Sequence, residues 1–155
     1  MTILSIDSGL ERTGYAIFRN SVYICSGLIK TSKTQIKEKR LKEIYDSVND
    51  LVKKQRPDMI VLERLFFFRN QKTVITISQA QGVILLLAAQ NNIPVEFLTP
   101  LQIKSIITGY GKADKKAVQK MISLTLKIPD ITQDDESDAV ACGLAYCYLN
   151  KNLIK

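Results

Sequence analysis

Two short apolar runs that each end in an acid constrain the fold of this chain more than any other feature. Residues 2–7 are TILSID, and residues 59–63 are MIVLE. Runs this short and compact predict buried strands rather than helices. A carboxylate at the end of a strand belongs to an ordinary turn or is delivered to a site at the edge of the sheet. Asp7 and Glu63 occupy these positions, and neither residue decides the question alone.

The rest of the chain predicts strands first and then an alternation of helices and strands. Residues 13–20 and 21–31 predict two strands that meet at a polar Asn20-Ser21 turn, and VEFL at 95–98 predicts another strand. Helical spacing of apolar residues predicts helices at 36–54, 71–90, 101–108, 113–127 and 134–149, with Asp114 as an N-cap. The expected fold is therefore α/β, with a mixed central sheet flanked by helices on both faces.

Composition narrows the class of protein. The 155 residues fit one domain, 1–155, and 22 Lys and Arg against 15 Asp and Glu leave a net charge of +7. This charge suits a polyanion such as nucleic acid, and it also suits a generally basic soluble protein. There is no histidine, which excludes histidine-based triads and histidine-ligated zinc.

Cysteine use and hydropathy predict the compartment. The three cysteines form no CxxC pair, which argues against a zinc knuckle and against a disulfide framework. A reducing, cytoplasmic location fits best. The longest internal apolar run, 83–89, is too short to span a bilayer, so no membrane partner is expected.

A third group of acids opens the last predicted helix, in TQDDESDAVACG. Asp134, Asp135 and Glu136 could simply be capping charges that favour the positive end of the helix dipole. Asp135 and Asp138, however, lie three residues apart and share one helical face. The small residues after Asp138 would let the helix approach the sheet closely. Asp134 competes with Asp135, because it lies four residues before Asp138.

Four converging carboxylates would repel one another unless divalent cations neutralised them. All-oxygen ligands suit Mg²⁺ or Mn²⁺, and a pair of such ions can hydrolyse a phosphodiester. Gly9 and Gly14 have no Cβ, so they would leave room for a nucleic-acid strand to approach the metals closely. They could equally well be turn glycines.

Four segments carry a resemblance to a known family. SIDSGLERTGYAIF, IVLERLFF, GYGKADKKAVQKM and DDESDAVACGLAY resemble the RuvC family of Holliday junction resolvases, over essentially the whole chain. The resemblance implies a ribonuclease H-like fold, a homodimer and Mg²⁺-dependent cutting of two symmetry-related strands of a four-way DNA junction. It also implies that the metal ligands are Asp7, Glu63, Asp135 and Asp138.

The same resemblance implies a DNA-binding set. Lys115 corresponds to the basic residue near the scissile phosphate, Lys104 to a DNA-contacting lysine and Phe66 to the aromatic residue that stacks on bases near the crossover. Lys112 and Arg69 are expected on the DNA as well. Phe67 or Phe68 shares the stacking or packs inward.

Three points stay open at this stage. The helix at 71–90 is either the dimerisation helix that the family implies or a fully buried central helix. The family's usual DPG is DSG here, which removes a rigid proline beside Asp7 and would loosen that turn. The alternative functions are a broader branched-DNA endonuclease of the phage type and a branched-DNA-binding protein without activity. A branch-migration motor is a candidate partner.

Overall fold

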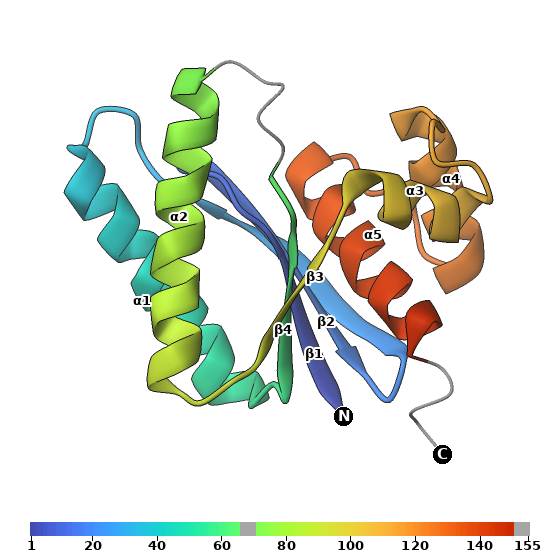
Figure 1. Cartoon of the computed structure of the whole chain (residues 1–155), viewed down its shortest axis with the longest axis horizontal. Helices are drawn as coiled ribbons and strands as arrows, with labels where there is room; N and C mark the ends of the chain where they lie inside the picture. The colour runs from blue at the N-terminus through green and yellow to red at the C-terminus, as the bar shows by residue number, and fades with distance from the viewer. Residues whose placement is uncertain (66–70, 151–155) are drawn as a thin grey trace.

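The fold is built on one mixed sheet. The computed structural model describes residues 1–65 and 71–150, and its five strands are ordered β3-β2-β1-β4-β5 (Figure 1). Strands β1 (Thr2–Asp7), β2 (Arg12–Arg19) and β3 (Val22–Lys30) form an antiparallel meander. Strand β4 (Met59–Glu63) runs parallel to β1, and β5 (Val95–Leu98) runs parallel to β4. The predicted α/β class and mixed sheet are confirmed.

The turn between β2 and β3 has the predicted position. Asn20 and Ser21 both have positive φ, at 50° and 64°. Two consecutive left-handed residues match the twist of a two-residue hairpin, and asparagine tolerates this conformation better than most residues do. The local sequence is therefore sufficient to place this turn.

Helices cover both faces of the sheet, as expected (Figure 1). Helices α1 (Lys37–Gln55) and α2 (Gln71–Gln90) lie on one face. Helices α3 (Pro100–Thr108), α4 (Lys115–Leu126) and α5 (Asp134–Leu149) lie on the other. Alternate residues of β1 serve the two cores: Ile3 packs in the cluster with α5, whereas Leu4 and Ile6 pack in the cluster with α1 and α2. A central strand buried on both faces explains the continuous apolar run.

Helix α5 lies directly on the sheet because its residues are small. Any Cβ on Gly143 would overlap the ring of Phe18 and the hydroxyl of Ser5. The fully buried Ser5 Oγ donates to the carbonyl oxygen of Ala139 at 2.8 Å, so a side chain of β1 holds the helix backbone. This close approach carries the N-terminal turn of α5 towards the ends of β1 and β4.

Helix α2 has one buried side and one apolar side that the described residues leave exposed. Ala80, Ile84 and Leu87 are fully buried, whereas Ile75 and Leu86 are 55% and 56% exposed. Within the described parts of the chain, 72–90 is the one helix long and apolar enough to cross a membrane, a test that core helices also pass. The buried side packs in the same cluster as β1 and α1, which indicates a core helix.

Candidate active site

Asp7 and Glu63 lie next to each other at the carboxyl edge of the sheet. Strands β1 and β4 are parallel and pair Ile6 with Leu62, so the two acids that follow end neighbouring strands. Both acids fall on the side of the sheet that faces α5, since residues two positions apart in a strand share a face. The Glu63 carbonyl oxygen accepts a hydrogen bond from Gln81 Nε2 at 2.8 Å, which ties this strand end to α2. The predicted convergence of the two strand ends is thus present.

Gly14 admits the first turn of α5 to the same edge. It pairs with Asp7 across the β1–β2 ladder, and a Cβ on Gly14 would overlap the carbonyl oxygen of Asp135. The space above Gly14 is therefore filled by α5, and the prediction that this glycine makes room for a nucleic-acid strand is wrong. A Cβ on Gly9 would overlap the carbonyl oxygen of Arg12, as expected for a turn glycine.

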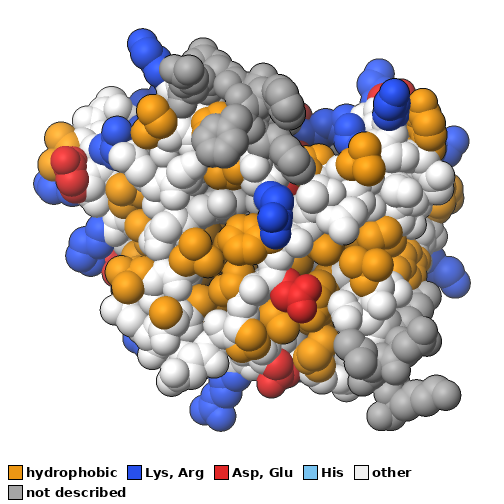
Figure 2. All heavy atoms as spheres, in the orientation of Figure 1, with side chains coloured by type: hydrophobic (Ala, Val, Ile, Leu, Met, Phe, Trp, Pro, Cys, Tyr) orange, Lys and Arg blue, Asp and Glu red, His pale blue; other side chains and the backbone are white. Residues whose placement is uncertain are grey.

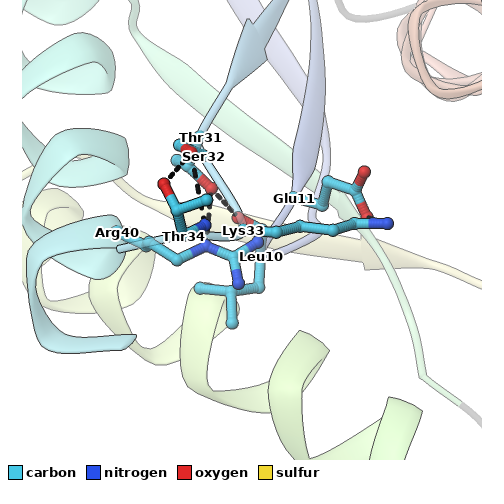
Figure 3. A network of polar contacts seen from close by, with 7 residues as sticks. All are labelled: Leu10, Glu11, Thr31, Ser32, Lys33, Thr34 and Arg40. Carbon is cyan, nitrogen blue, oxygen red and sulfur yellow. Dashed lines mark hydrogen bonds and ion pairs between the residues drawn. The ribbon is translucent and has the colours of Figure 1, made fainter. Parts of the chain in front are cut away.

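The turn that follows Asp7 is held by side-chain hydrogen bonds. Thr13 Oγ1 donates to the Gly9 carbonyl oxygen at 2.7 Å, and Thr31 Oγ1 donates to that of Leu10 at 2.6 Å. Thr31 Oγ1 in turn accepts from Arg40 Nε of α1 at 2.9 Å (Figure 3). These bonds hold the backbone at Gly9 and Leu10, and the loosening of the turn by the loss of proline at Ser8 stays a prediction.

The electrostatics show that four carboxylates share this edge. The pKa of Asp7 is raised from 3.8 to about 8, first by burial and then by the negative charges of Asp138, Glu63 and Asp135. Lys115 opposes the shift. The charges of these three acids make Asp7 harder to ionise, and a positive charge nearby makes it easier.

Lys115 supplies part of that charge to Asp138. Its Nζ donates to Asp138 Oδ2 at 2.9 Å and lies 3.5 Å from Asp134 Oδ2. Burial alone would lower the pKa of Lys115, but the hydrogen bond and the charge of Asp138 raise it above its ordinary value. Burial raises the pKa of Asp138, and Lys115 counteracts that rise. The lysine therefore stays protonated beside the acids.

The consecutive acids of α5 point to different neighbours. Asp134 pairs with two residues of α4, accepting from Gln119 Nε2 at 3.3 Å in addition to the contact with Lys115. Asp135, and not Asp134, is among the charges that raise the pKa of Asp7. Asp134 thus contacts α4, whereas Asp135 acts electrostatically on Asp7; which of the two binds a metal stays a prediction.

A pocket opens beside the acids. Its volume is about 160 Å³, and its lining includes Glu63, Asp138, Lys104 and Lys115. Two of the three lysines predicted on the DNA, Lys104 and Lys115, thus lie in one cavity with two of the carboxylates. Lys112 is exposed in the turn before α4, whereas Phe66 and Arg69 lie outside the described residues.

The donor chemistry suits a hard divalent cation. No group of three or more acidic or thiol side chains among residues 1–65 and 71–150 is arranged to hold a metal ion in this structure. The four acids nevertheless offer only carboxylate oxygens, the ligands that Mg²⁺ and Mn²⁺ prefer. Burial and the charges of the three other acids raise the pKa of Asp7, so a bound cation would favour its ionised form. The four acids therefore fit Mg²⁺ or Mn²⁺ by the chemistry of their oxygen atoms.

Comparison with known proteins identifies the family. The family model described as Crossover junction endodeoxyribonuclease RuvC matches residues 3–147. The chain belongs to the RuvC family. Proteins named Crossover junction endodeoxyribonuclease RuvC include one from Fusobacterium nucleatum, 44% identical over 94% of this chain and 80% of the relative. Another, from Brachyspira hyodysenteriae, is 43% identical over 97% of this chain and 96% of the relative.

Solved structures support the fold. RuvC from Thermus thermophilus superposes with a TM-score of 0.87 at 23% identity, covering 98% of this chain and 96% of that one. The T. thermophilus RuvC in complex with a Holliday junction substrate gives 0.90 at 23%, covering 99% and 97%. The ribonuclease H-like fold is confirmed. RuvC-family nucleases are metal-dependent, which agrees with the carboxylate edge.

One polar contact of the site was not predicted from the sequence. Ser26 of β3 donates to Glu136 of α5 at 2.5 Å, and the Tyr23 hydroxyl lies 2.8 Å from Ser26 Oγ. Glu136 had only a capping role in the sequence interpretation. The contact joins residues 110 positions apart, and a serine in an edge strand carries no pattern that would reveal it.

Proposed function

We propose that this RuvC-family chain resolves four-way DNA junctions by paired, symmetric nicks made through metal-dependent phosphodiester hydrolysis. The proposal is supported by the charge interactions of Asp7 with Glu63, Asp135 and Asp138 and by the hydrogen bond from Lys115 to Asp138. The family model matches this chain from residue 3 to residue 147. The net charge of +7 suits the substrate, because DNA presents a dense row of phosphates.

The four carboxylates would hold Mg²⁺, with Mn²⁺ as a substitute. Bound metal would activate the attacking water and stabilise the leaving oxygen. Asp135 is the better ligand candidate than Asp134, since Asp134 is engaged by Lys115 and Gln119 of α4. Asp7 acts as the central ligand, because its charge is the least tolerable without a cation.

Lys115 and Lys104 provide the positive wall of the pocket. Lys115 is held 2.9 Å from Asp138 and is 44% exposed, so it can reach outward to a phosphate oxygen. A fixed cation there stabilises the charge that develops in the transition state. Lys104 and Lys112 would contact the DNA backbone. Base stacking by Phe66 and a DNA contact by Arg69 remain predictions from the family resemblance.

A homodimer explains the uncovered side of α2. Figure 2 shows hydrophobic side chains gathered over the face on which α2 and β5 lie in Figure 1. Exposed residues of α2 include Ile75, Leu85 and Leu86. A two-fold dimer through this face would cover them and present two equal sites to a junction that is itself nearly two-fold symmetric. A branch-migration motor in a bacterial cytoplasm would be a further partner.

The test uses labelled four-way, three-way and linear DNA, each with Mg²⁺ or with EDTA. Wild type is compared with Asp7→Asn and with the matched control Asp50→Asn, an exposed acid on α1. The proposal expects paired nicks in the four-way junction, lost in EDTA and in Asp7→Asn but kept in Asp50→Asn. Equal cutting of three-way DNA would replace it with a broader branched-DNA endonuclease. Junction binding without cuts in Mg²⁺ would refute enzymatic activity.

A further inference from the structure

Three consecutive acids at the start of α5 have three different neighbours. Asp134 contacts Lys115 and Gln119 of α4, and the carbonyl oxygen of Asp135 lies over Gly14, the strand partner of Asp7. Glu136 turns the other way and accepts a hydrogen bond from Ser26 Oγ of β3, at 2.5 Å. The first turn of α5 is therefore bonded on both of its flanks, with the candidate metal ligand between them.

The contact between Ser26 and Glu136 is short and has its own support. A serine hydroxyl has one proton, so when Ser26 donates it to Glu136, the Tyr23 hydroxyl at 2.8 Å must be the donor to Ser26. A carboxylate acceptor makes such a bond shorter and stronger than a neutral pair would. Tyr23, Ser26 and Glu136 form a directed chain from β3 to α5.

A purely capping role does not account for Glu136. A glutamate at the third position of a helix can cap it by bonding the backbone N–H of the N-cap residue. The N-cap here is Gln133, which makes no side-chain cap hydrogen bond, and the carboxylate of Glu136 goes to Ser26 instead. The bond joins α5 to a strand two places away from β1 in the sheet.

We infer that Glu136 is a positioning residue: through Ser26 it holds the first turn of α5 so that Asp135 and Asp138 face Asp7. Gly14 sets how closely the turn approaches, because only a residue without Cβ fits beneath the Asp135 carbonyl. Ser26 and Glu136 set its rotation. The inference rests on the proposed nuclease function, since it names what orders two of the four proposed ligands.

The test combines Ser26→Ala, Glu136→Ala and their double variant. Glu136→Gln is the conservative variant, since its amide oxygen can still accept the bond. Glu38→Ala is the matched control, an exposed acid in the first turn of α1. Calorimetric titration with Mn²⁺ is done without DNA. Hydrogen exchange of residues 134–142 is followed in the metal-free protein, and junction binding is measured in EDTA.

The inference expects both single variants to bind Mn²⁺ roughly tenfold more weakly, the low end for losing an outer partner of metal ligands. The double variant should bind Mn²⁺ no more weakly than either single variant, because each single change already removes the same hydrogen bond between Ser26 and Glu136. Residues 134–142 should exchange faster, while α1 exchange and junction binding in EDTA stay unchanged. Glu136→Gln should bind Mn²⁺ nearly as wild type does, and Glu38→Ala should match wild type in every measurement.

Two results would overturn the inference. Wild-type Mn²⁺ affinity and wild-type exchange in Ser26→Ala would show that the contact positions nothing. Weak Mn²⁺ binding in Glu136→Ala and Glu136→Gln, with normal binding in Ser26→Ala, would show that the carboxylate acts directly on the metal. A wild-type protein that neither binds Mn²⁺ nor cuts junctions would instead refute the proposed function, while the exchange comparison still decides whether the contact orders α5.

Discussion

Replacing Asp7 by asparagine is expected to stabilise the metal-free protein while abolishing cleavage. Asp7 lies among Glu63, Asp135 and Asp138, and its pKa is raised from 3.8 to about 8 by burial and by their charges. Asparagine keeps the size of the side chain and removes the charge. The variant therefore loses the proposed central metal ligand and relieves the repulsion that this ligand creates in the absence of metal.

The sign and size of the change in the free energy of unfolding follow from the difference in Asp7 pKa between the folded and the unfolded chain. Below about pH 4, Asp7 is protonated in the folded and the unfolded chain and contributes nothing. As the pH rises towards 8, the unfolded chain releases this proton and the folded chain keeps it, so the free energy of unfolding falls. At about 1.4 kcal/mol per pKa unit, the loss grows by roughly 3–4 kcal/mol between pH 5 and pH 8.

The assay is urea unfolding in EDTA at pH 5, 6, 7 and 8, at one protein concentration. The free energy of unfolding of Asp7→Asn should rise relative to wild type by roughly 3–4 kcal/mol across this range. The cost of burying the amide is the same at every pH and cancels from the comparison. Added Mg²⁺ at pH 8 should stabilise wild type and leave Asp7→Asn nearly unchanged, because ligand binding stabilises only a protein that binds it.

A constant difference would refute the reasoning. If Asp7→Asn and wild type differ by the same free energy at pH 5 and pH 8, within about 0.5 kcal/mol, Asp7 is not held protonated among the other acids. Asp50→Asn, on the exposed face of α1, controls for the removal of one negative charge and should follow wild type at every pH.

Three further outcomes are expected. Lys115→Met should slow single-turnover cleavage roughly 100-fold or more while junction binding persists, and Lys116→Met on the same helix should not; equal rates for both would exclude a role at the phosphate. Gly14→Ala should lower the free energy of unfolding by about 1–3 kcal/mol and abolish cleavage, measured by urea unfolding and junction cutting, because a Cβ there overlaps the α5 backbone. Leu86→Glu should convert a dimer to a monomer in sedimentation and replace paired nicks by single ones; an unchanged dimer would place the interface elsewhere.

The local pattern of the chain predicted most of the elements correctly. The helix from Asp134 to Leu149 begins and ends where its spacing indicated, and the Asn20-Ser21 turn has the left-handed geometry that a two-residue hairpin needs. Period and turn chemistry are properties of neighbouring residues, so they can be taken from the sequence directly. The positions of Asp7 and Glu63 at strand ends followed from the same patterns.

The role of Gly14 could not be predicted in this way. In the sequence it stands in a strand, and its neighbours say nothing about what lies above it. The structure places the carbonyl oxygen of Asp135, 121 residues later, in the space where its Cβ would be. The different contacts of Asp134 and Asp135 have the same origin, since both spacings allow a face shared with Asp138 and only the position of α4 gives Asp134 its partners.

Sequence by itself determined which residues form strands and helices, that acids stand at three element ends, and which family the motifs resemble. Only the tertiary structure decided that Asp7 is half-buried and acted on by the other acids, that Glu136 turns to Ser26, and that the described residues leave one apolar side of α2 exposed. The physical reason is range. Periodicity acts over one or two turns of chain, whereas burial, desolvation and charge repulsion depend on residues that meet only after the sheet and its helices have assembled.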